Sequence, residues 1–249
     1  MKKVITNILV FAVIFTFSGC DVLNDTAEAI LETPTSGQSN KPSLTNQEVV
    51  SGLKEALTVG IKNAVDVTSV TNGFLGNNEI RLPFPESAQN MKAKAEDWGL
   101  ESQVEKIVET LNRAAEDASK EATPIFVNAI KNMSINDGFA ILNGGEGAAT
   151  NFLRNNTTQQ LIAAFSPRVE ESISKVKLTD YWNPVMTRYN QAMTITGGDK
   201  VDTDLNRYVT ERAIDGLFTM VEKEENKIRH DPTARVTDLL TKVFGSLNN

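Results

Sequence analysis

Residues 204–229 have the sequence DLNRYVTERAIDGLFTMVEKEENKIR. The apolar residues in this stretch recur every three or four positions, which is the spacing of one face of an α-helix. They are Leu205, Val209, Ala213, Leu217, Met220 and Val221. Around the middle turns, Ile214 and Phe218 widen this face past half of the helix circumference. A helix that is apolar so far round is buried among other elements. We therefore predict that residues 204–229 form the central helix of a helical bundle.

Two further stretches carry strong helix patterns. Thr45 and Glu48 have the spacing of a capping box, and an amphipathic pattern follows through Val65. In residues 101–122 the apolar stripe is narrow and rich in alanine, which indicates the close approach of a neighbouring helix. Its members are Val104, Ile107, Val108, Leu111, Ala114, Ala115, Ala118 and Ala122.

Weaker signals predict the remaining elements. Turns are expected at residues 71–73, 76–78, 144–147 and 197–198, and a short extended piece at residues 80–82. Further helices are expected at residues 86–98, 123–133, 167–176 and 179–192. Two more helices are expected to start at Ser134 and Thr157, and a short helix between them carries Phe152 and Leu153. A final helix is expected from Asp231-Pro232 to Gly245.

No strand pattern of comparable strength appears in the chain. The predicted fold class is therefore all-α, with a single bundle-like helical domain at residues 44–249. The composition suits such a domain, because 40% of the 249 residues are hydrophobic.

The N-terminus has the layout of a secretory signal. Lys2 and Lys3 precede the mostly apolar residues 4–17, which are too few to span a bilayer comfortably. Phe17-Ser18-Gly19-Cys20 resembles the bacterial lipobox, in which the cysteine receives a lipid and cleavage follows just before it. Phe17 departs from the usual aliphatic residue. An ordinary signal peptide with an incidental cysteine is the alternative, but Cys20 is the only cysteine in the chain.

These features predict three segments. Residues 1–19 form a lipoprotein signal peptide, residues 20–43 a lipidated cysteine and flexible tether, and residues 44–249 the helical domain. The tether is predicted because its second half is rich in turn-forming residues and lacks apolar periodicity. The expected location is the cell envelope, facing the periplasm, and Asp21 slightly favours the inner membrane by its resemblance to the enteric sorting signal.

The net charge of the chain limits the kinds of partner that it can bind. Removing Lys2 and Lys3 from the 25 basic residues leaves 23 against 32 acidic ones, a net charge near −9. Such an acidic surface repels nucleic acids and anionic lipid headgroups. We therefore expect no nucleic-acid partner, and we expect membrane attachment through the lipid on Cys20.

The usual catalytic and metal-binding patterns are missing. His230 is the only histidine and lies at a helix junction, so we expect neither a catalytic triad, nor a zinc site, nor a cofactor. The loop at residues 144–147 precedes a helix, where N–H groups can hold an anion. It lacks the lysine and hydroxyl of a phosphate loop, so we interpret it as a helix-to-helix turn.

Two clusters of charged residues allow two interpretations. The first cluster is Glu109, Arg113, Glu116 and Asp117, and the second is Glu222, Glu224, Glu225, Lys227 and Arg229. The favoured interpretation is a solvated helix face with weak ion pairs. The alternative is a pair of carboxylates that act on glycans.

Several motifs are shared with a known family. They are Leu111-Asn112-Arg113-Ala114-Ala115-Glu116, Ala148 to Arg154, Tyr208-Val209-Thr210 with Asp215 to Phe218, Glu224 to Arg229, and Ala234-Arg235 with Val243-Phe244-Gly245. In these motifs the chain resembles a bacterial lipoprotein family catalogued as domain of unknown function 4197, over about residues 46–245. The resemblance implies an exported, lipid-anchored, mainly helical protein, and it implies no activity or catalytic residue.

The polar residues of these motifs are the candidate site. They are Asn112, Arg113, Glu116, Arg154, Asp215, Glu225, Arg229 and Arg235. We favour a network that ties helix ends together, because buried charges must be paired. A ligand site is the alternative.

The predicted function is non-catalytic binding, with an envelope protein or a small apolar molecule as partner. The alternative is a hydrolase that acts on envelope glycans, which requires a carboxyl group of raised pKa in a cleft. A structural spacer without a ligand is a third hypothesis.

Overall fold

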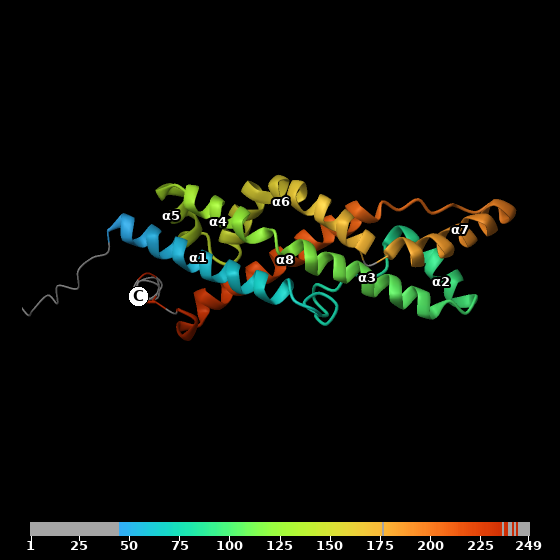
Figure 1. Cartoon of the computed structure of the whole chain (residues 1–249). Coiled ribbons are helices and arrows are strands. Elements are labelled where there is room, and N and C mark those ends of the chain that lie inside the picture. The colour runs from blue at the N-terminus through green and yellow to red at the C-terminus, as the bar shows by residue number, and fades with distance from the viewer. Residues whose placement is uncertain (1–44, 176, 236, 239–240, 242, 244–249) are drawn as a thin grey trace, which may run out of the picture. The chain divides into compact units, whose positions relative to one another are not determined.

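The computed structural model of the chain describes residues 45–175, 177–235, 237, 238, 241 and 243 (Figure 1). Residues 43–249 form one compact unit. The predicted signal peptide, Cys20 and the tether lie outside the described residues, as does most of the predicted final helix. Those predictions stay untested.

Eight α-helices make up the described part of the domain. They are α1 (Asn46–Thr68), α2 (Gln89–Asp97), α3 (Glu101–Ser119), α4 (Ala122–Asn132), α5 (Ile135–Asn143), α6 (Ala148–Lys175), α7 (Leu178–Thr196) and α8 (Leu205–His230). Single 3₁₀ turns occupy Glu86–Ala88 and Pro232–Ala234. No strand occurs among the residues that are described. The all-α prediction is confirmed.

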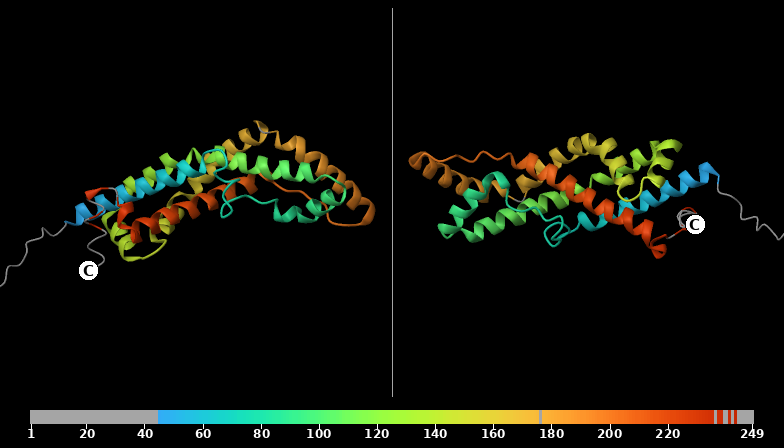
Figure 2. Two further views of the ribbon diagram at one scale, coloured as in Figure 1. Left: turned by 90° about the horizontal axis from the view of Figure 1, so that it is seen from below. Right: turned by 180° about the vertical axis from the view of Figure 1, so that it is seen from behind.

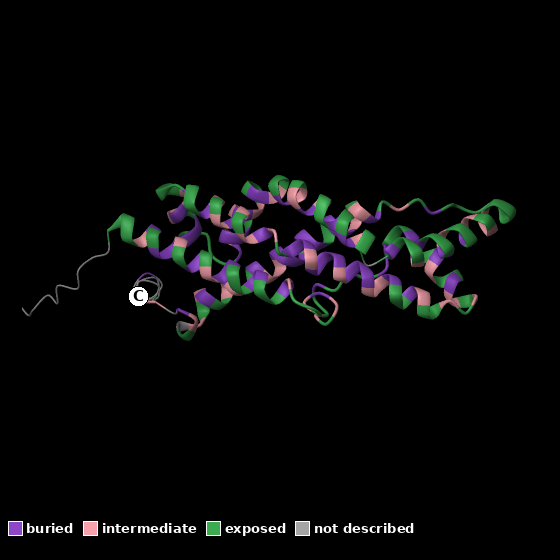
Figure 3. Cartoon of the chain, viewed as in Figure 1, coloured by how far each residue is buried: buried purple, intermediate pink, exposed green. Residues whose placement is uncertain are grey.

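Helix α8 is the central helix, as the sequence predicts. It packs against α1, α3 and α6, and Figures 1 and 2 show these helices running beside it. Leu217 and Phe218 on α8 are fully buried. The buried residues of the domain form one core cluster, and Figure 3 shows buried segments along each of these helices. Burial on several sides explains why the apolar face of α8 exceeds half of its circumference.

The other helices pack at the two ends of this core. Helices α4 and α5 lie on α1, whereas α2 and α7 pack together beside α3 (Figure 1). Phe84, in the segment before α2, stacks on Trp182 of α7 with ring centroids 5.5 Å apart. The segment 197–204 returns from the end of α7 to the start of α8.

Local signals place several helix ends correctly. Thr45 and Glu48 form the predicted capping box, and Ser134 forms a second one with Asp137. Gly197 ends α7 in a left-handed conformation with φ of 73°. These ends depend on contacts between residues three or four positions apart, which sequence spacing shows directly.

Helix α6 differs from the prediction. The sequence predicts three short helices between residues 148 and 176, whereas the chain forms one helix of 28 residues. Thr157 marks no helix start, because its hydroxyl donates to the C=O of Leu153 within the helix at 2.7 Å. Pro167 lies inside the helix. Phe165 and Val169, on either side of it, are fully buried, and this packing against α3 and α8 outweighs the local helix-breaking signal.

Smaller differences concern helix boundaries. Helix α3 ends at Ser119 and α4 begins at Ala122, where the sequence predicts one helix through residue 122. The predicted helix 86–98 begins as a 3₁₀ turn before α2. Residues 80–82 form no strand, and the backbone of Leu82 is instead held by the side chain of Asn112.

Candidate functional site

The eight polar residues of the candidate site lie in three separate places rather than around one cleft. They are the α3 group Asn112, Arg113 and Glu116, the α8 group Glu225, Arg229 and Arg235, and the pair Arg154 and Asp215.

Asn112 of the α3 group holds the backbone of Leu82. Its Oδ1 accepts a hydrogen bond from the Leu82 N–H, and its Nδ2 donates to the Leu82 C=O, both at 2.9 Å. Nδ2 also donates to the C=O of Val108 at 2.7 Å. Asn112 is fully buried, so these bonds replace the water lost on burial. A single amide side chain thus fixes the segment that leads to α2.

Glu116 of the α3 group holds the turn that follows α1. Its Oε1 accepts hydrogen bonds from the N–H groups of Phe74 and Leu75, both at 3.2 Å. Its Oε2 pairs with Arg113 Nη1 at 2.8 Å. Arg113 Nη2 donates to Asn72 Oδ1 at 2.9 Å. The charge of the buried Glu116 carboxylate is therefore compensated by two backbone amides and a guanidinium. These hydrogen bonds fix the backbone at Phe74, whose ring is fully buried in the core.

In the α8 group, Glu225 holds the start of α6. Its Oε1 accepts from the Ala149 N–H at 3.0 Å. Its Oε2 accepts from the Thr150 N–H at 2.9 Å and from the Thr150 hydroxyl at 2.8 Å. The N-terminus of a helix favours negative charge, and here Glu225 supplies that charge. The loop at residues 144–147 is thus a helix-to-helix turn, as predicted, and the first N–H groups of α6 bind a carboxylate of the chain itself.

Arg229 neutralises Glu225 and also holds the end of α5. Its Nε and Nη2 donate to Glu225 Oε1 at 3.0 and 2.9 Å. Nη2 also donates to the C=O of Ile141 at 2.8 Å. Arg235 lies beyond α8 and donates from Nε to the C=O of Ile228 at 3.1 Å and from Nη2 to the C=O of Arg229 at 2.8 Å. The α8 group therefore bonds the ends of α5, α6 and α8.

Arg154 and Asp215 form the third place, at the surface. Their side chains pair at 3.0 Å while 42% and 59% exposed. The guanidinium of Arg154 also lies over the ring of Phe218, 4.3 Å from its centroid. An exposed pair of this kind contributes at most about 1 kcal/mol.

Burial corrects one interpretation of the charged clusters. Glu116 and Glu225 are only 4% and 5% exposed, so they do not belong to solvated helix faces. The solvated-face interpretation does fit Glu222 and Lys227, which are exposed. Sequence spacing places all four on helices, but only tertiary contacts separate the buried carboxylates from the exposed charges.

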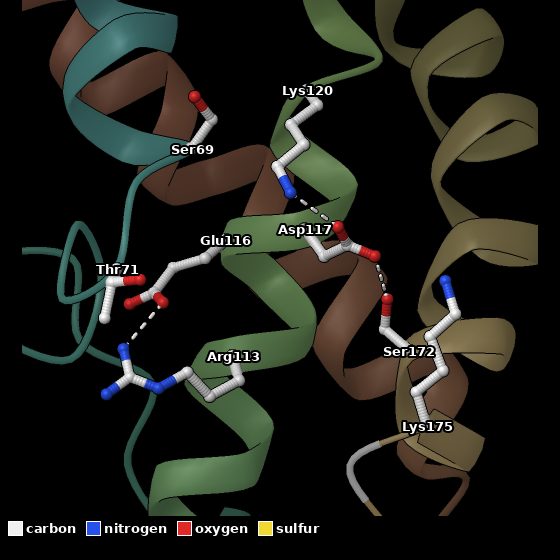
Figure 4. Close-up of a pocket in the computed structure, with 8 residues that line it drawn as sticks. All are labelled: Ser69, Thr71, Arg113, Glu116, Asp117, Lys120, Ser172 and Lys175. Atoms are coloured by element: carbon white, nitrogen blue, oxygen red, sulfur yellow. Dashed lines mark hydrogen bonds and ion pairs between the residues drawn. The ribbon is translucent and has the colours of Figure 1, made fainter.

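A polar cavity of about 260 Å³ adjoins the α3 group, and Figure 4 shows the eight residues that line it. Asp117 lies between two partners: Lys120 Nζ pairs with its Oδ1 at 2.7 Å, and the Ser172 hydroxyl bonds its Oδ2. Burial by itself raises the pKa of the Asp117 carboxyl. The hydrogen bonds from Lys120 and Ser172 and the charges of Lys120 and Lys175 outweigh burial and hold this pKa below its ordinary value.

The cavity in Figure 4 therefore lacks what the glycan-hydrolase alternative requires. That alternative needs a carboxyl group whose pKa is raised, and the pKa of Asp117 is lowered. The second carboxylate of the cavity, Glu116, is occupied by Arg113 and two backbone amides. The glycan-hydrolase alternative stays a prediction, and the residues of this cavity do not favour it.

A larger groove of about 500 Å³ lies between α6, α7 and residues 202–206, and we call it the α6–α7 groove. Its apolar lining consists of Trp182 and Leu205, which are buried, and Ile173 and Met186, which are half-buried. Its other lining residues are polar or acidic. No sequence pattern predicts this groove, because its residues come from three segments that no single periodicity connects.

The space around the α8 group is small by comparison. A void of about 10 Å³ lies there between α1, α8 and the start of α6, next to Glu225 and Arg229. That volume is at the lower limit for one water molecule. It is too small for an apolar ligand held between these helices.

His230 lies at the surface. Its Nε2 is 3.3 Å from Glu146 Oε1, and its Nδ1 is 2.9 Å from the C=O of Asn226. Within the described part of the chain, no group of three or more His, Cys, Asp or Glu side chains has the geometry of a metal site. No helix in that part is both long enough and apolar enough to cross a bilayer.

Comparison with known proteins identifies the family. A family model described as "Protein of unknown function (DUF4197)" matches residues 43–245. The chain belongs to this family. The match confirms the predicted family and does not test the lipid anchor. Searches of curated proteins and of solved structures found no significant match.

The family motifs can now be related to structure in this DUF4197 domain. All three members of the α3 group lie within residues 111–116, and Glu225 and Arg229 lie within the motif at residues 224–229. All of these residues except Arg113 make hydrogen bonds to backbone groups of other segments. Two acidic residues shortly after Gly197-Gly198, Asp202 and Asp204, are the sequence signal that could have indicated the α6–α7 groove.

Proposed function

We propose that this DUF4197 domain is a lipid-anchored, periplasm-facing domain that acts by binding another protein of the cell envelope, without catalysis. The lipobox-like residues ending in Cys20 support the anchor, and the composition of residues 20–43 supports a tether. The observation that carries the binding proposal is the α6–α7 groove, an open groove of about 500 Å³ lined by both apolar and polar residues.

A protein fits this groove better than a small apolar molecule does. Ligand sites for small molecules enclose most of the ligand surface in a mainly apolar cavity. The α6–α7 groove has polar or acidic residues along most of its lining, and the void beside the α8 group holds only about 10 Å³. Protein-binding grooves, in contrast, combine an apolar centre with a polar rim.

In-cell photocrosslinking tests this proposal. A photoreactive amino acid replaces Asn183, an exposed residue of the groove, in the full chain. The matched control replaces Glu55, an exposed residue of α1. We expect a discrete adduct from position 183 only, and mass spectrometry should identify an exported partner segment within it. Equal adducts from both positions, or none from position 183, would contradict the proposal.

A further inference from the structure

The α6–α7 groove has an uncompensated negative charge. Glu170, Asp202 and Asp204 line it, and no lysine or arginine does. Glu170 and Asp202 make no ion pair and accept no hydrogen bond from any residue that the structure describes. Asp204 uses one oxygen to cap α8, accepting from the Arg207 N–H at 2.9 Å. Carboxylate oxygens therefore remain free along the groove.

The polar cavity beside the α3 group shows how different this arrangement is. In the cavity of Figure 4, Asp117 pairs with Lys120, and Glu116 pairs with Arg113. Those carboxylates are neutralised within the fold. The carboxylates of the α6–α7 groove have no such partner among the residues that the structure describes, so a cationic ligand is their natural complement.

The walls of the groove are held in place by the fold. Asn206 of α8 exchanges hydrogen bonds with Ser166 of α6, at 2.8 Å through the Ser166 hydroxyl and 2.9 Å through its C=O. Asn190 of α7 holds the N–H and C=O of Val201, both at 2.9 Å. Such links prepare the groove before a ligand arrives, which lowers the entropic cost of binding.

Ile173 and Met186 supply the accessible apolar surface of the groove. Trp182 is held by the ring of Phe84, with centroids 5.5 Å apart, and Ile173 and Met186 are half-buried around it. A flexible methionine side chain adapts to aliphatic groups of several shapes. The groove therefore combines apolar surface with negative charge.

We infer that the α6–α7 groove binds a peptide segment of a partner protein that carries both lysine or arginine and apolar side chains. This inference rests on the proposed function and adds the chemistry of the partner. The chain's own tether is a poor occupant, because residues 20–43 contain Asp21, Asp25, Glu28 and Glu32 against the single cation Lys41. Like charges would repel it from the groove.

Peptide binding to the mature full chain tests the inference. The probe is a fluorescent nine-residue peptide of alternating lysine and leucine, and two matched peptides carry glutamate or glutamine in place of lysine. The groove variant is Glu170→Gln with Asp202→Asn. Its matched control is Glu55→Gln with Asp66→Asn, which removes two exposed acidic charges from α1.

We expect the groove variant to bind the lysine peptide about fivefold or more weakly at low salt, and the control variant to differ from the wild type by less than about twofold. The glutamate peptide should not bind. Equal losses in both variants, or equal binding of all three peptides, would overturn the inference. Thermal unfolding of each variant shows that the fold is retained, since the four substituted residues are exposed.

Two further outcomes separate this inference from the proposed function. If crosslinks from position 183 persist unchanged in the groove variant, the partner is bound without the carboxylates, and only the charge inference fails. If light scattering shows that the wild-type chain dimerises and the groove variant does not, the occupant is a second copy of the chain, which also overturns the inference.

Discussion

Glu225 and Arg229 lie one turn apart on α8 and bond the backbone of two other helices. Glu225 accepts hydrogen bonds from the first turn of α6, and Arg229 donates to the last turn of α5. Their direct pairing at 2.9 Å compensates both charges in a site where the side chains are only 4% and 11% exposed. One ion pair on the central helix thus positions the junction between α5 and α6.

Replacing Glu225 by alanine should strongly destabilise the domain. The substitution leaves Arg229 nearly buried without its counter-charge and removes the acceptor from two N–H groups of α6. We expect a loss of about 3–5 kcal/mol in the free energy of unfolding, measured by chemical denaturation. Glu211→Ala, at an exposed position of the same helix, should change it by less than about 0.5 kcal/mol. Similar effects of both substitutions would show that the pair contributes little.

Asn112→Asp tests the bond between α3 and the segment before α2. The carboxylate keeps an acceptor for the Leu82 N–H, but it lacks the two N–H donors that serve the C=O groups of Leu82 and Val108. We expect a loss of about 1–3 kcal/mol in unfolding free energy and faster hydrogen exchange at the Leu82 amide. Asn128→Asp, on the exposed face of α4, is the matched control and should leave both quantities nearly unchanged.

Gly216→Ala should overpack the core beside α8. A Cβ at Gly216 would lie 2.7 Å from Cε1 of Phe74 and 3.1 Å from Cβ of Ile80. We expect a loss of about 1–3 kcal/mol, and Phe74→Leu should partly restore stability in the double variant. Gly60→Ala on α1 is the contrasting case, because its Cβ would meet Glu224 at an ordinary 3.4 Å. It should be neutral or stabilising by up to about 1 kcal/mol. Equal losses at both glycines would contradict the packing argument.

The lowered pKa of Asp117 predicts a pH dependence. The folded state binds the proton of this carboxyl more weakly than the unfolded state does, so ionised Asp117 stabilises the fold above the ordinary pKa of about 3.8. That contribution is lost as the pH falls through the lower folded-state value. Asp117→Asn should therefore be less stable than the wild type at pH 6, and the difference should shrink toward pH 2.5. A difference that stays constant between these pH values would contradict the assignment.

Lipid attachment at Cys20 is the fifth prediction. Cells that express the full chain should incorporate labelled fatty acid into it, and Cys20→Ala should abolish the label. A variant with Phe17→Leu, which restores the usual aliphatic lipobox residue, should keep the label and serves as the positive control. Label that persists in Cys20→Ala would show that the anchor assignment is wrong.

The sequence predicts local hydrogen bonds at helix starts, but it does not predict hydrogen bonds between distant segments. The helix starts at Thr45 and Ser134 follow from side chains that bond backbone groups three residues away. Asn112 and Glu225 were selected by family motifs, but the motifs could not show that these side chains hold Leu82 and the start of α6, 30 and 75 or more residues distant in the chain. Partners so far apart are brought together only by folding.

The sequence by itself determined the all-α class, the central position of α8, the capping box at Thr45, the helix start at Ser134 and the family, because each depends on residue identity at short spacing. The tertiary structure alone decided that α6 continues through Thr157 and Pro167, that Glu116 and Glu225 are buried, and that three segments form an acidic groove. The reason is that packing between distant segments sets the burial of each side chain, and burial decides whether a carboxylate must find a partner within the fold or stays free to bind one outside it.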